Sequence, residues 1–131
     1  MDKTIRRSRA EGSVTAPSSK SYAQRAVAAA LLCEGTSTLT NMILCDDTRA
    51  ALQVAADLGA EVEAGTDGTT YTVRGGLRPH AQAIHIGESG LAARLFTPIA
   101  ALCGERITIT GQGSTLRRPL AMMEKPMRTR V

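Results

Sequence analysis

The sequence predicts an α/β fold in which helices alternate with short strands. Apolar side chains at helical spacing predict helices at about 20–34, 47–58 and 89–103. Runs of β-branched and apolar residues predict strands at about 37–42, 60–64, 70–75, 83–87 and 106–111. A Thr-Asp-Gly turn between the second and third of these strands predicts a hairpin. We also expect an extended segment at 12–16.

The chain contains an apparent internal repeat. The stretch LLCEGTSTLTN at 31–41 aligns with ALCGERITITG at 101–111 at an offset of 70. At an offset of 69, Ser21 aligns with Gly90 and Arg25 with Arg94. One structural unit used twice explains these matches, and the alternative is two similar βα segments that share only composition.

On the repeat, residues 16–80 form one complete unit and residues 81–131 form most of a second. The hairpin that closes the first unit has no counterpart in the second. A sheet without its last two strands leaves an unpaired edge and an uncovered helix face. We therefore expect the chain to be part of a larger protein.

The composition excludes several classes of protein. With one Phe, two Tyr and no Trp, the chain lacks the stacking platforms of a single-strand nucleic-acid binder. Cys33, Cys45 and Cys103 show no Cys-x-x-Cys spacing and are predicted to be reduced thiols of the core, without a metal or disulfide role. No apolar run reaches the roughly 18 residues of a membrane helix, so we expect a cytoplasmic protein with no membrane partner.

Charge is distributed unevenly along the chain. The overall net charge is +4, but residues 1–25 and 101–131 each carry +4, while residues 26–100 carry −4. Two basic ends could bind nucleic acid, or they could meet around a small, strongly anionic substrate. The remaining alternative is an ordinary solvated surface.

The stretch APSSKSYAQR at 16–25 places polar and basic side chains at the start of the first predicted helix. Unpaired N–H groups and a partial positive charge make a helix start favourable for anions. Lys20 and Ser21 lie at this start, and Arg25 follows Ser21 by four residues on the same helix face. The pattern indicates a phosphate pocket, and the alternative is a well-capped helix with an exposed lysine.

Two later stretches carry similar features. In GESGLAAR, Gly90 allows close approach to the backbone and Arg94 repeats the cation of the first helix. In GSTLRRPLA, Arg118 precedes Pro119, which is typical of a first helical turn, so a further helix is expected from Arg118. Other interpretations remain open: a turn glycine at 90, a structural partner for Arg94 at Asp46 or Asp47, and an exposed Arg117.

The three stretches, in this order, resemble the N-terminal part of the 5-enolpyruvylshikimate-3-phosphate synthase family, also called 3-phosphoshikimate 1-carboxyvinyltransferase. The resemblance extends over essentially the whole chain. It implies two domains, each assembled from three βαβαββ units of the enolpyruvyl transferase type. Residues 1–15 would then cross over to the other domain, and residues 16–131 would form part of the N-terminal domain.

The resemblance also implies an activity. The family transfers the enolpyruvyl group of phosphoenolpyruvate to the 5-hydroxyl of shikimate 3-phosphate, releasing phosphate, on the pathway to chorismate and the aromatic amino acids. No metal or organic cofactor is implied, and neither is a nucleic-acid partner. The full enzyme is expected to be monomeric. The proton-transferring groups come from later parts of the family's chain, so no catalytic residue is expected here and the isolated chain is expected to be inactive.

Site residues follow by position. The family's S-K-S-x-x-x-R motif falls on Ser19, Lys20, Ser21 and Arg25. Lys20, Ser21 and Arg25 would bind shikimate 3-phosphate, while Lys20, Gly90 and Arg118 would bind phosphoenolpyruvate. Arg94 and Asp47 are expected to support the site.

The sequence departs from the commonest family pattern beside Gly90. Glu88 and Ser89 stand where Asn and Ala are usual, and Leu91 replaces Thr. The carboxylate of Glu88 would repel the anionic substrates unless it points away, and sensitivity to glyphosate stays open. Three alternatives also remain: a UDP-N-acetylglucosamine enolpyruvyl transferase, an RNA 3′-phosphate cyclase, and a non-catalytic truncated product.

Overall fold

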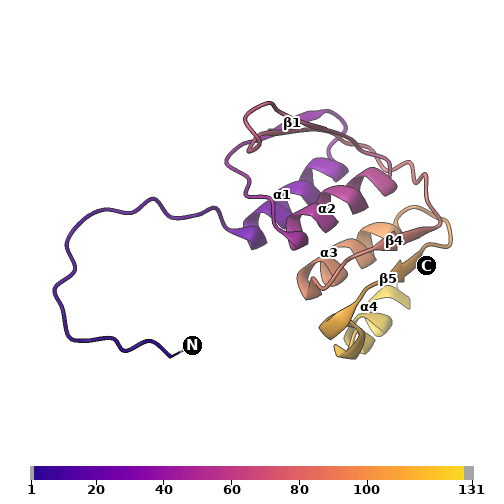
Figure 1. Cartoon of the computed structure of the whole chain (residues 1–131). Coiled ribbons are helices and arrows are strands. Elements are labelled where there is room, and N and C mark those ends of the chain that lie inside the picture. Colours follow the sequence, from indigo (N-terminus) through magenta and orange to yellow (C-terminus); the bar gives the residue numbers. More distant parts are fainter. Residues whose placement is uncertain (1, 129–131) are drawn as a thin grey trace.

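Three helices lie between two small sheets, and an extended N-terminal segment runs away from this body (Figure 1). The structure is a computed structural model that describes residues 2–128. The helices are α1 (Lys20–Leu32), α2 (Asp46–Asp57), α3 (Gly90–Ala101) and the short α4 (Glu124–Arg128). The strands are β1 (Thr36–Leu39), β2 (Glu61–Ala64), β3 (Tyr71–Arg74), β4 (Ala83–His85) and β5 (Thr108–Thr110). Two 3-10 helices, η1 (Gly113–Arg117) and η2 (Ala121–Met123), precede α4.

The two sheets differ in topology. In the first sheet the order is β1-β3-β2, and β3 runs antiparallel to both neighbours. In the second sheet β4 and β5 are parallel, with Ile84 opposite Ile109. Because α3 connects β4 to β5, this part of the chain is a βαβ unit, as the sequence predicts. The hairpin formed by β2 and β3 is likewise confirmed.

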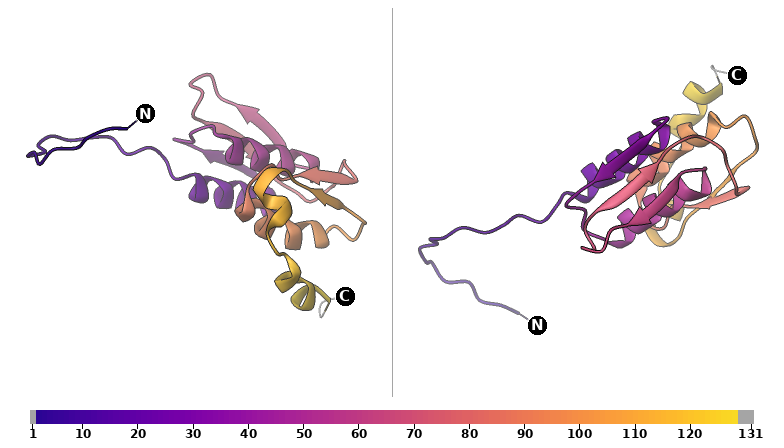
Figure 2. Two further views of the ribbon diagram at one scale, coloured as in Figure 1. Left: turned by 60° about the horizontal axis from the view of Figure 1, so that its bottom comes forward. Right: turned by 90° about the horizontal axis from the view of Figure 1, so that it is seen from above.

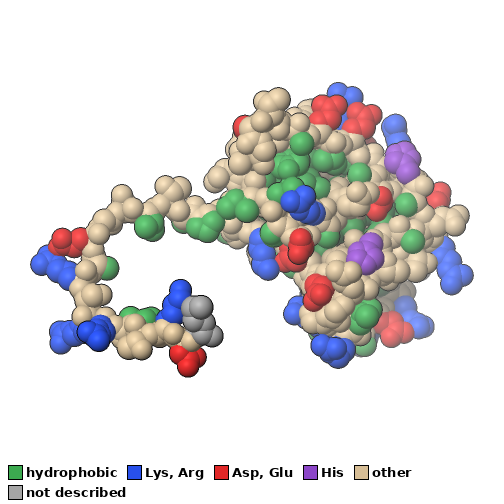
Figure 3. Space-filling model, viewed as in Figure 1, with side chains coloured by type: hydrophobic (Ala, Val, Ile, Leu, Met, Phe, Trp, Pro, Cys, Tyr) green, Lys and Arg blue, Asp and Glu red, His purple; other side chains and the backbone are tan. Residues whose placement is uncertain are grey.

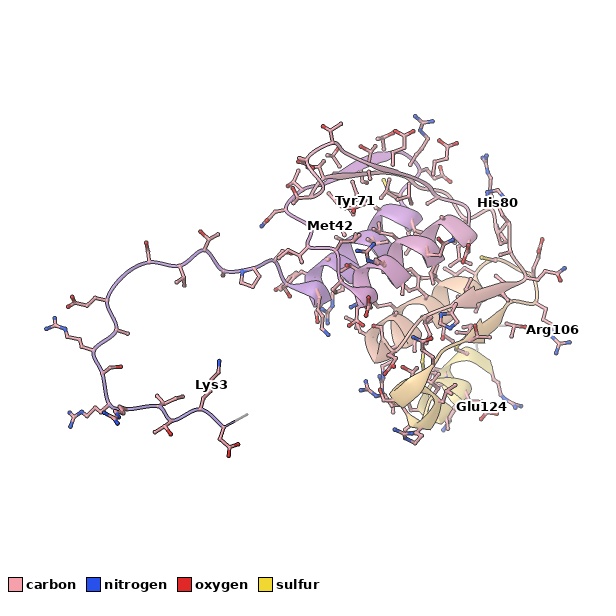
Figure 4. All side chains as sticks on the ribbon, viewed as in Figure 1. Lys3, Met42, Tyr71, His80, Arg106 and Glu124 are labelled. Atoms are coloured by element: carbon pink, nitrogen blue, oxygen red, sulfur yellow. The ribbon has the colours of Figure 1, made fainter. Side chains whose placement is uncertain are left out.

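The core is built mainly from small side chains. Each of the three longer helices buries several alanines, including Ala28, Ala55 and Ala92. Phe96, Leu31 and Leu58 are the bulkiest of the fully buried residues. Because small side chains let helix axes approach closely, α1 packs against both α2 and α3. Figure 4 shows Met42 and Tyr71 between the first sheet and these helices.

The N-terminal segment stands apart from the body. Residues 2–17 are exposed throughout and form no strand. Two further views show the segment leaving the body at the start of α1 (Figure 2). Its basic side chains are well separated from those of the body (Figure 3), and Lys3 lies near its far end (Figure 4). The basic N-terminal residues before Ala16 therefore do not contribute to a site on the body.

Two expectations from the sequence are wrong. The helical segment expected from Arg118 starts later, with η2 at Ala121 followed by α4, because the backbone of Arg118 is extended at φ −85° and ψ 127°. The ring of Pro119 disfavours a helical conformation in the preceding residue, so η1 ends there instead. The cysteines are not buried in the core either: Cys33 is exposed, Cys45 is half-buried, and Cys103 is half-buried and packs against the edge of the core. Cys33 caps the end of α1, where the helix turns toward β1.

No helix of residues 2–128 combines the length and the apolar character needed to cross a bilayer.

Gly75 constrains the connection between α1 and the first sheet. Its N–H donates to the Gly35 carbonyl at 3.0 Å, which ties the end of β3 to the turn after α1. A Cβ atom at this position would collide with the carbonyl oxygens of Ala30, Leu31 and Cys33. Gly75 therefore lets the sheet approach the end of α1.

Replacing Gly75 with alanine should destabilise the fold. Since the colliding atoms belong to the backbone, relief requires the sheet and α1 to separate, and we expect a loss of about 3 kcal/mol in the free energy of unfolding. Urea unfolding monitored by circular dichroism measures this loss. Gly35→Ala is the control, because its Cβ would meet only the Cys33 sulfur at 3.9 Å. Equal stability of the two variants would contradict this explanation.

The hairpin turn should respond to acid through Asp67. Its carboxylate accepts hydrogen bonds from the Thr69 and Thr70 amides at 2.9 and 2.8 Å and from the Thr70 hydroxyl at 2.7 Å. These bonds, led by the one from the Thr70 hydroxyl, lower the pKa of Asp67 to about 2. The folded pKa lies below the unfolded one, so the stabilisation is present above about pH 4 and is lost as the pH falls toward 2.

We therefore expect Asp67→Asn to lower the melting temperature at pH 7 and to have little effect near pH 2. Thermal unfolding at both pH values measures the difference. Glu63→Gln is the control, because it removes the same charge from β2 and the Glu63 side chain forms no hydrogen bond or ion pair within residues 2–128. A pH-independent effect of Asp67→Asn would argue against the proposed role of its ionised carboxylate.

Candidate functional site

The starts of α1, α2 and α3 open onto one cavity of about 370 Å³. It is lined by Lys20, Ser21 and Gln24 of α1, Asp47 of α2, Glu88 to Leu91 around the start of α3, and Ser114 and Arg118. Each helix start carries a partial positive charge from its unpaired N–H groups. Three such starts around one space make the cavity favourable for an anion.

The starts of α1 and α3 are built alike. The Ser19 hydroxyl accepts a hydrogen bond from the Tyr22 amide at 3.4 Å, and the Ser89 hydroxyl accepts one from the Ala92 amide at 3.1 Å. The two capping serines are 70 residues apart, which is the offset of the sequence repeat downstream. The capping geometry thus extends the repeat through both helix starts.

Lys20 is held at the cavity by Asp47. Its ammonium lies 2.9 Å from the Asp47 carboxylate, and the side chains are 64% and 21% exposed. The hydrogen bond and the charge of Asp47 raise the pKa of Lys20 above its usual value. Lys20 is therefore fully charged at neutral pH, and its position is fixed by the first turn of α2.

Arg118 occupies the space beside Gly90. A Cβ atom on Gly90 would collide with the Arg118 guanidinium. The extended backbone before Pro119 turns the Arg118 side chain toward the start of α3, and the Arg118 amide donates to the Thr115 carbonyl at 3.1 Å. Because Gly90 has no side chain, the Arg118 guanidinium fits beside it. From the sequence we expected this space to serve only the close approach of a ligand.

Glu88 lies on the cavity wall and is engaged with the backbone of η1. Its carboxylate accepts a hydrogen bond from the Ser114 amide at 3.3 Å. Gly113 has a φ of +55°, and a Cβ atom there would collide with this carboxylate. The acceptor oxygens of Glu88 are therefore directed toward η1, which moderates the expected repulsion of anions.

The two arginines of the helix starts bond to their own helices. Arg25 donates to the Ser21 carbonyl at 3.1 Å, and Arg94 donates to the Gly90 carbonyl at 2.8 Å. Neither side chain lines the cavity. The alternative in which Arg94 pairs with Asp46 or Asp47 is not observed.

Five of the expected residues thus meet at the cavity: Lys20, Ser21, Asp47, Gly90 and Arg118. Sequence reasoning missed Gln24, although a signal was present, because Gln24 is polar at a position where the helical spacing of α1 calls for a buried residue. Ser114 carried no comparable signal. Within residues 2–128, no group of three or more His, Cys, Asp or Glu side chains could hold a metal ion.

Comparisons with known proteins agree with the resemblance. The sequence model of the EPSP synthase (3-phosphoshikimate 1-carboxyvinyltransferase) family matches residues 5–130. The 3-phosphoshikimate 1-carboxyvinyltransferase of Chlamydia caviae is 40% identical over 111 residues, which is 84% of this chain and 25% of the relative. That of Methanothermobacter thermautotrophicus is 36% identical over 121 residues, or 92% of this chain and 29% of the relative.

A solved structure matches as well. EPSP synthase from Acinetobacter baumannii superimposes with a TM-score of 0.73 at 28% sequence identity, covering 90% of this chain and 27% of that one. The α/β fold class is thereby confirmed. The chain spans about a quarter of the length of the relatives it matches. Because the family model matches residues 5–130, which is almost the whole chain, the chain belongs to the EPSP synthase (3-phosphoshikimate 1-carboxyvinyltransferase) family.

Proposed function

We propose that the cavity forms part of the substrate site of a 3-phosphoshikimate 1-carboxyvinyltransferase. The enzyme would transfer the enolpyruvyl group of phosphoenolpyruvate to the 5-hydroxyl of shikimate 3-phosphate, releasing phosphate. The observation that carries the proposal is the meeting of Lys20, Ser21, Gly90 and Arg118, from three separate segments, in one cavity. No metal or organic cofactor enters the proposal.

Each group has a role suited to its chemistry. The Lys20 ammonium and the Arg118 guanidinium neutralise phosphate and carboxylate oxygens through charge-assisted hydrogen bonds. The Ser21 hydroxyl and the N–H groups at the starts of α1 and α3 supply further donors. In this assignment Lys20, Ser21 and Arg25 bind shikimate 3-phosphate, while Lys20, Gly90 and Arg118 bind phosphoenolpyruvate.

The proposed role of Arg25 requires a change of hydrogen-bond partner, whereas that of Arg94 does not. Both guanidinium groups belong to exposed residues and are held by a carbonyl of the preceding helical turn. Phosphate oxygens are stronger acceptors than a neutral carbonyl, so a ligand phosphate would draw Arg25 toward it. Arg94 would remain a support for the start of α3.

The chain would bind and orient substrates without transferring protons. Addition to the enolpyruvyl carbon needs an acid and a base within hydrogen-bond reach of the reacting atoms. The two carboxylates of the cavity are engaged elsewhere, Asp47 with the Lys20 ammonium and Glu88 with the Ser114 amide. Proton transfer would therefore fall to groups outside residues 2–128.

The remaining parts of the proposal rest on the family resemblance alone. Residues 1–15 would cross over to a second domain, and residues 16–131 would form part of the first. The full enzyme would be a cytoplasmic monomer. Shikimate 3-phosphate and phosphoenolpyruvate would be its small-molecule partners.

Lys20→Ala should weaken binding of both substrates. Loss of a charge-assisted hydrogen bond corresponds to an affinity decrease of about tenfold or more. Arg25→Ala should weaken mainly shikimate 3-phosphate. Titration of the isotope-labelled 131-residue chain with each compound, followed by amide chemical shifts in NMR, measures both affinities.

Lys3→Ala is the matched control for these titrations. It removes the same charge from the exposed N-terminal segment, far from the cavity. An equal loss in this control would mean that net charge, rather than the cavity, governs binding. If Lys20→Ala binds both compounds as tightly as the original chain, the assignment of Lys20 is wrong.

The 131-residue chain alone should produce no 5-enolpyruvylshikimate 3-phosphate. The reason is that, by the family resemblance, the acid and the base that transfer the protons come from later parts of the family's chain. Release of phosphate from phosphoenolpyruvate in the presence of shikimate 3-phosphate is a direct measure of turnover. Phosphate release that depends on both substrates would contradict the assignment of proton transfer to other groups.

A further inference from the structure

A buried hydrogen bond joins the starts of α1 and α3. The Ser89 hydroxyl donates to the Gln24 side-chain oxygen at 2.7 Å. Both side chains are almost fully enclosed, with Gln24 1% and Ser89 3% exposed. The two residues are 65 positions apart in the chain, so the bond connects separate structural units.

This bond belongs to a short chain of hydrogen bonds that runs from the Lys20 carbonyl to the Ala92 amide. The Ala92 amide donates to the Ser89 hydroxyl at 3.1 Å, and the Gln24 side-chain nitrogen donates to the Lys20 carbonyl at 3.4 Å. The single proton of the Ser89 hydroxyl is used by Gln24, so Ser89 has none to donate to a ligand. Because both side chains are almost fully enclosed, we assign neither of them a direct contact with substrate.

We propose that Gln24 and Ser89 are positioning residues, which hold Lys20 at a fixed distance from Gly90 and Arg118. This inference rests on the proposed function, since it concerns the same cavity. The bond links the second turn of α1 to the cap of α3, so a change in it moves one wall of the cavity relative to the other. Substrate affinity then depends on the pair without contact between the pair and the substrate.

The physical need for such a link comes from the charges and the packing at this point. The partial positive charges at the starts of α1 and α3 repel each other across the cavity. Close to these starts, both helices bury alanines, among them Ala23 and Ala92. Small side chains interlock weakly and allow neighbouring helices to slide, whereas a satisfied buried hydrogen bond specifies one arrangement.

Four variants separate positioning from stability. Ser89→Ala leaves the Gln24 oxygen buried without a donor and also removes the hydroxyl that caps α3, whereas Gln24→Met keeps this cap and leaves the Ser89 hydroxyl without an acceptor. The double variant Gln24→Met/Ser89→Ala removes both polar groups, so it should recover part of the stability that Ser89→Ala loses. Ser89→Thr retains a hydroxyl and should retain affinity.

Affinity for phosphoenolpyruvate should not recover in the double variant. We expect binding about fivefold or more weaker than in the original chain, measured by NMR titration at a temperature where circular dichroism shows every variant folded. Val73→Ala is the matched control, because it removes buried volume from β3, away from the cavity, and should lower stability without lowering affinity.

A second readout needs no ligand. Residual dipolar couplings of backbone amides give the orientation of α1 relative to α3, which should change in the double variant and stay constant in Val73→Ala. Unchanged orientation and affinity in the double variant would overturn the positioning role. If the original chain fails to bind phosphoenolpyruvate, the proposed function fails, and the helix orientation alone then decides whether Gln24 and Ser89 are positioning residues.

Discussion

The convergence of three helix starts on one cavity is the constraint on which the site depends. Partial positive charges of like sign are brought together there, and this arrangement is unfavourable unless negative charge lies between them. Asp47 and Glu88 place two carboxylates at the cavity. Asp47 pairs with the Lys20 ammonium, and Glu88 accepts a hydrogen bond from the Ser114 amide. The same arrangement that requires internal carboxylates also makes the cavity receptive to a phosphate from outside.

The small-residue core is what allows the helix starts to converge. Alanines such as Ala28, Ala55 and Ala92 keep the helices close, and Gly75 lets the first sheet reach the end of α1. Larger side chains would separate the helices and enlarge the cavity beyond the reach of a single ligand. The scarcity of aromatic residues argues against a single-strand nucleic-acid binder, and it also allows the helix starts to lie close together around the cavity.

Local patterns in the sequence predicted the helices, the hairpin and four of the cavity residues, because caps, apolar spacing and turn residues are properties of short segments. The supporting role of Asp47 was expected only from the family resemblance. What failed depended on particular neighbours. Pro119 extends Arg118 and prevents the helix expected there. Gln24 breaks the apolar spacing of α1, yet its partner Ser89 is 65 positions away and no local pattern identifies it. Ser19 and Ser89 are 70 positions apart, whereas Arg25 and Arg94 are 69 positions apart, so an alignment on the arginines does not pair the two capping serines.

The partners of the cations have a consequence for selectivity. Lys20 already pairs with a carboxylate, and Arg25 and Arg94 each donate to a carbonyl, so a ligand competes with an internal acceptor at each of these three cations. A carboxylate ligand offers Lys20 no more charge than Asp47 already does. A phosphate dianion offers more charge and three acceptor oxygens, and it can engage several of these donors at once. The internal partners therefore favour ligands that carry phosphate over ligands that carry a carboxylate alone.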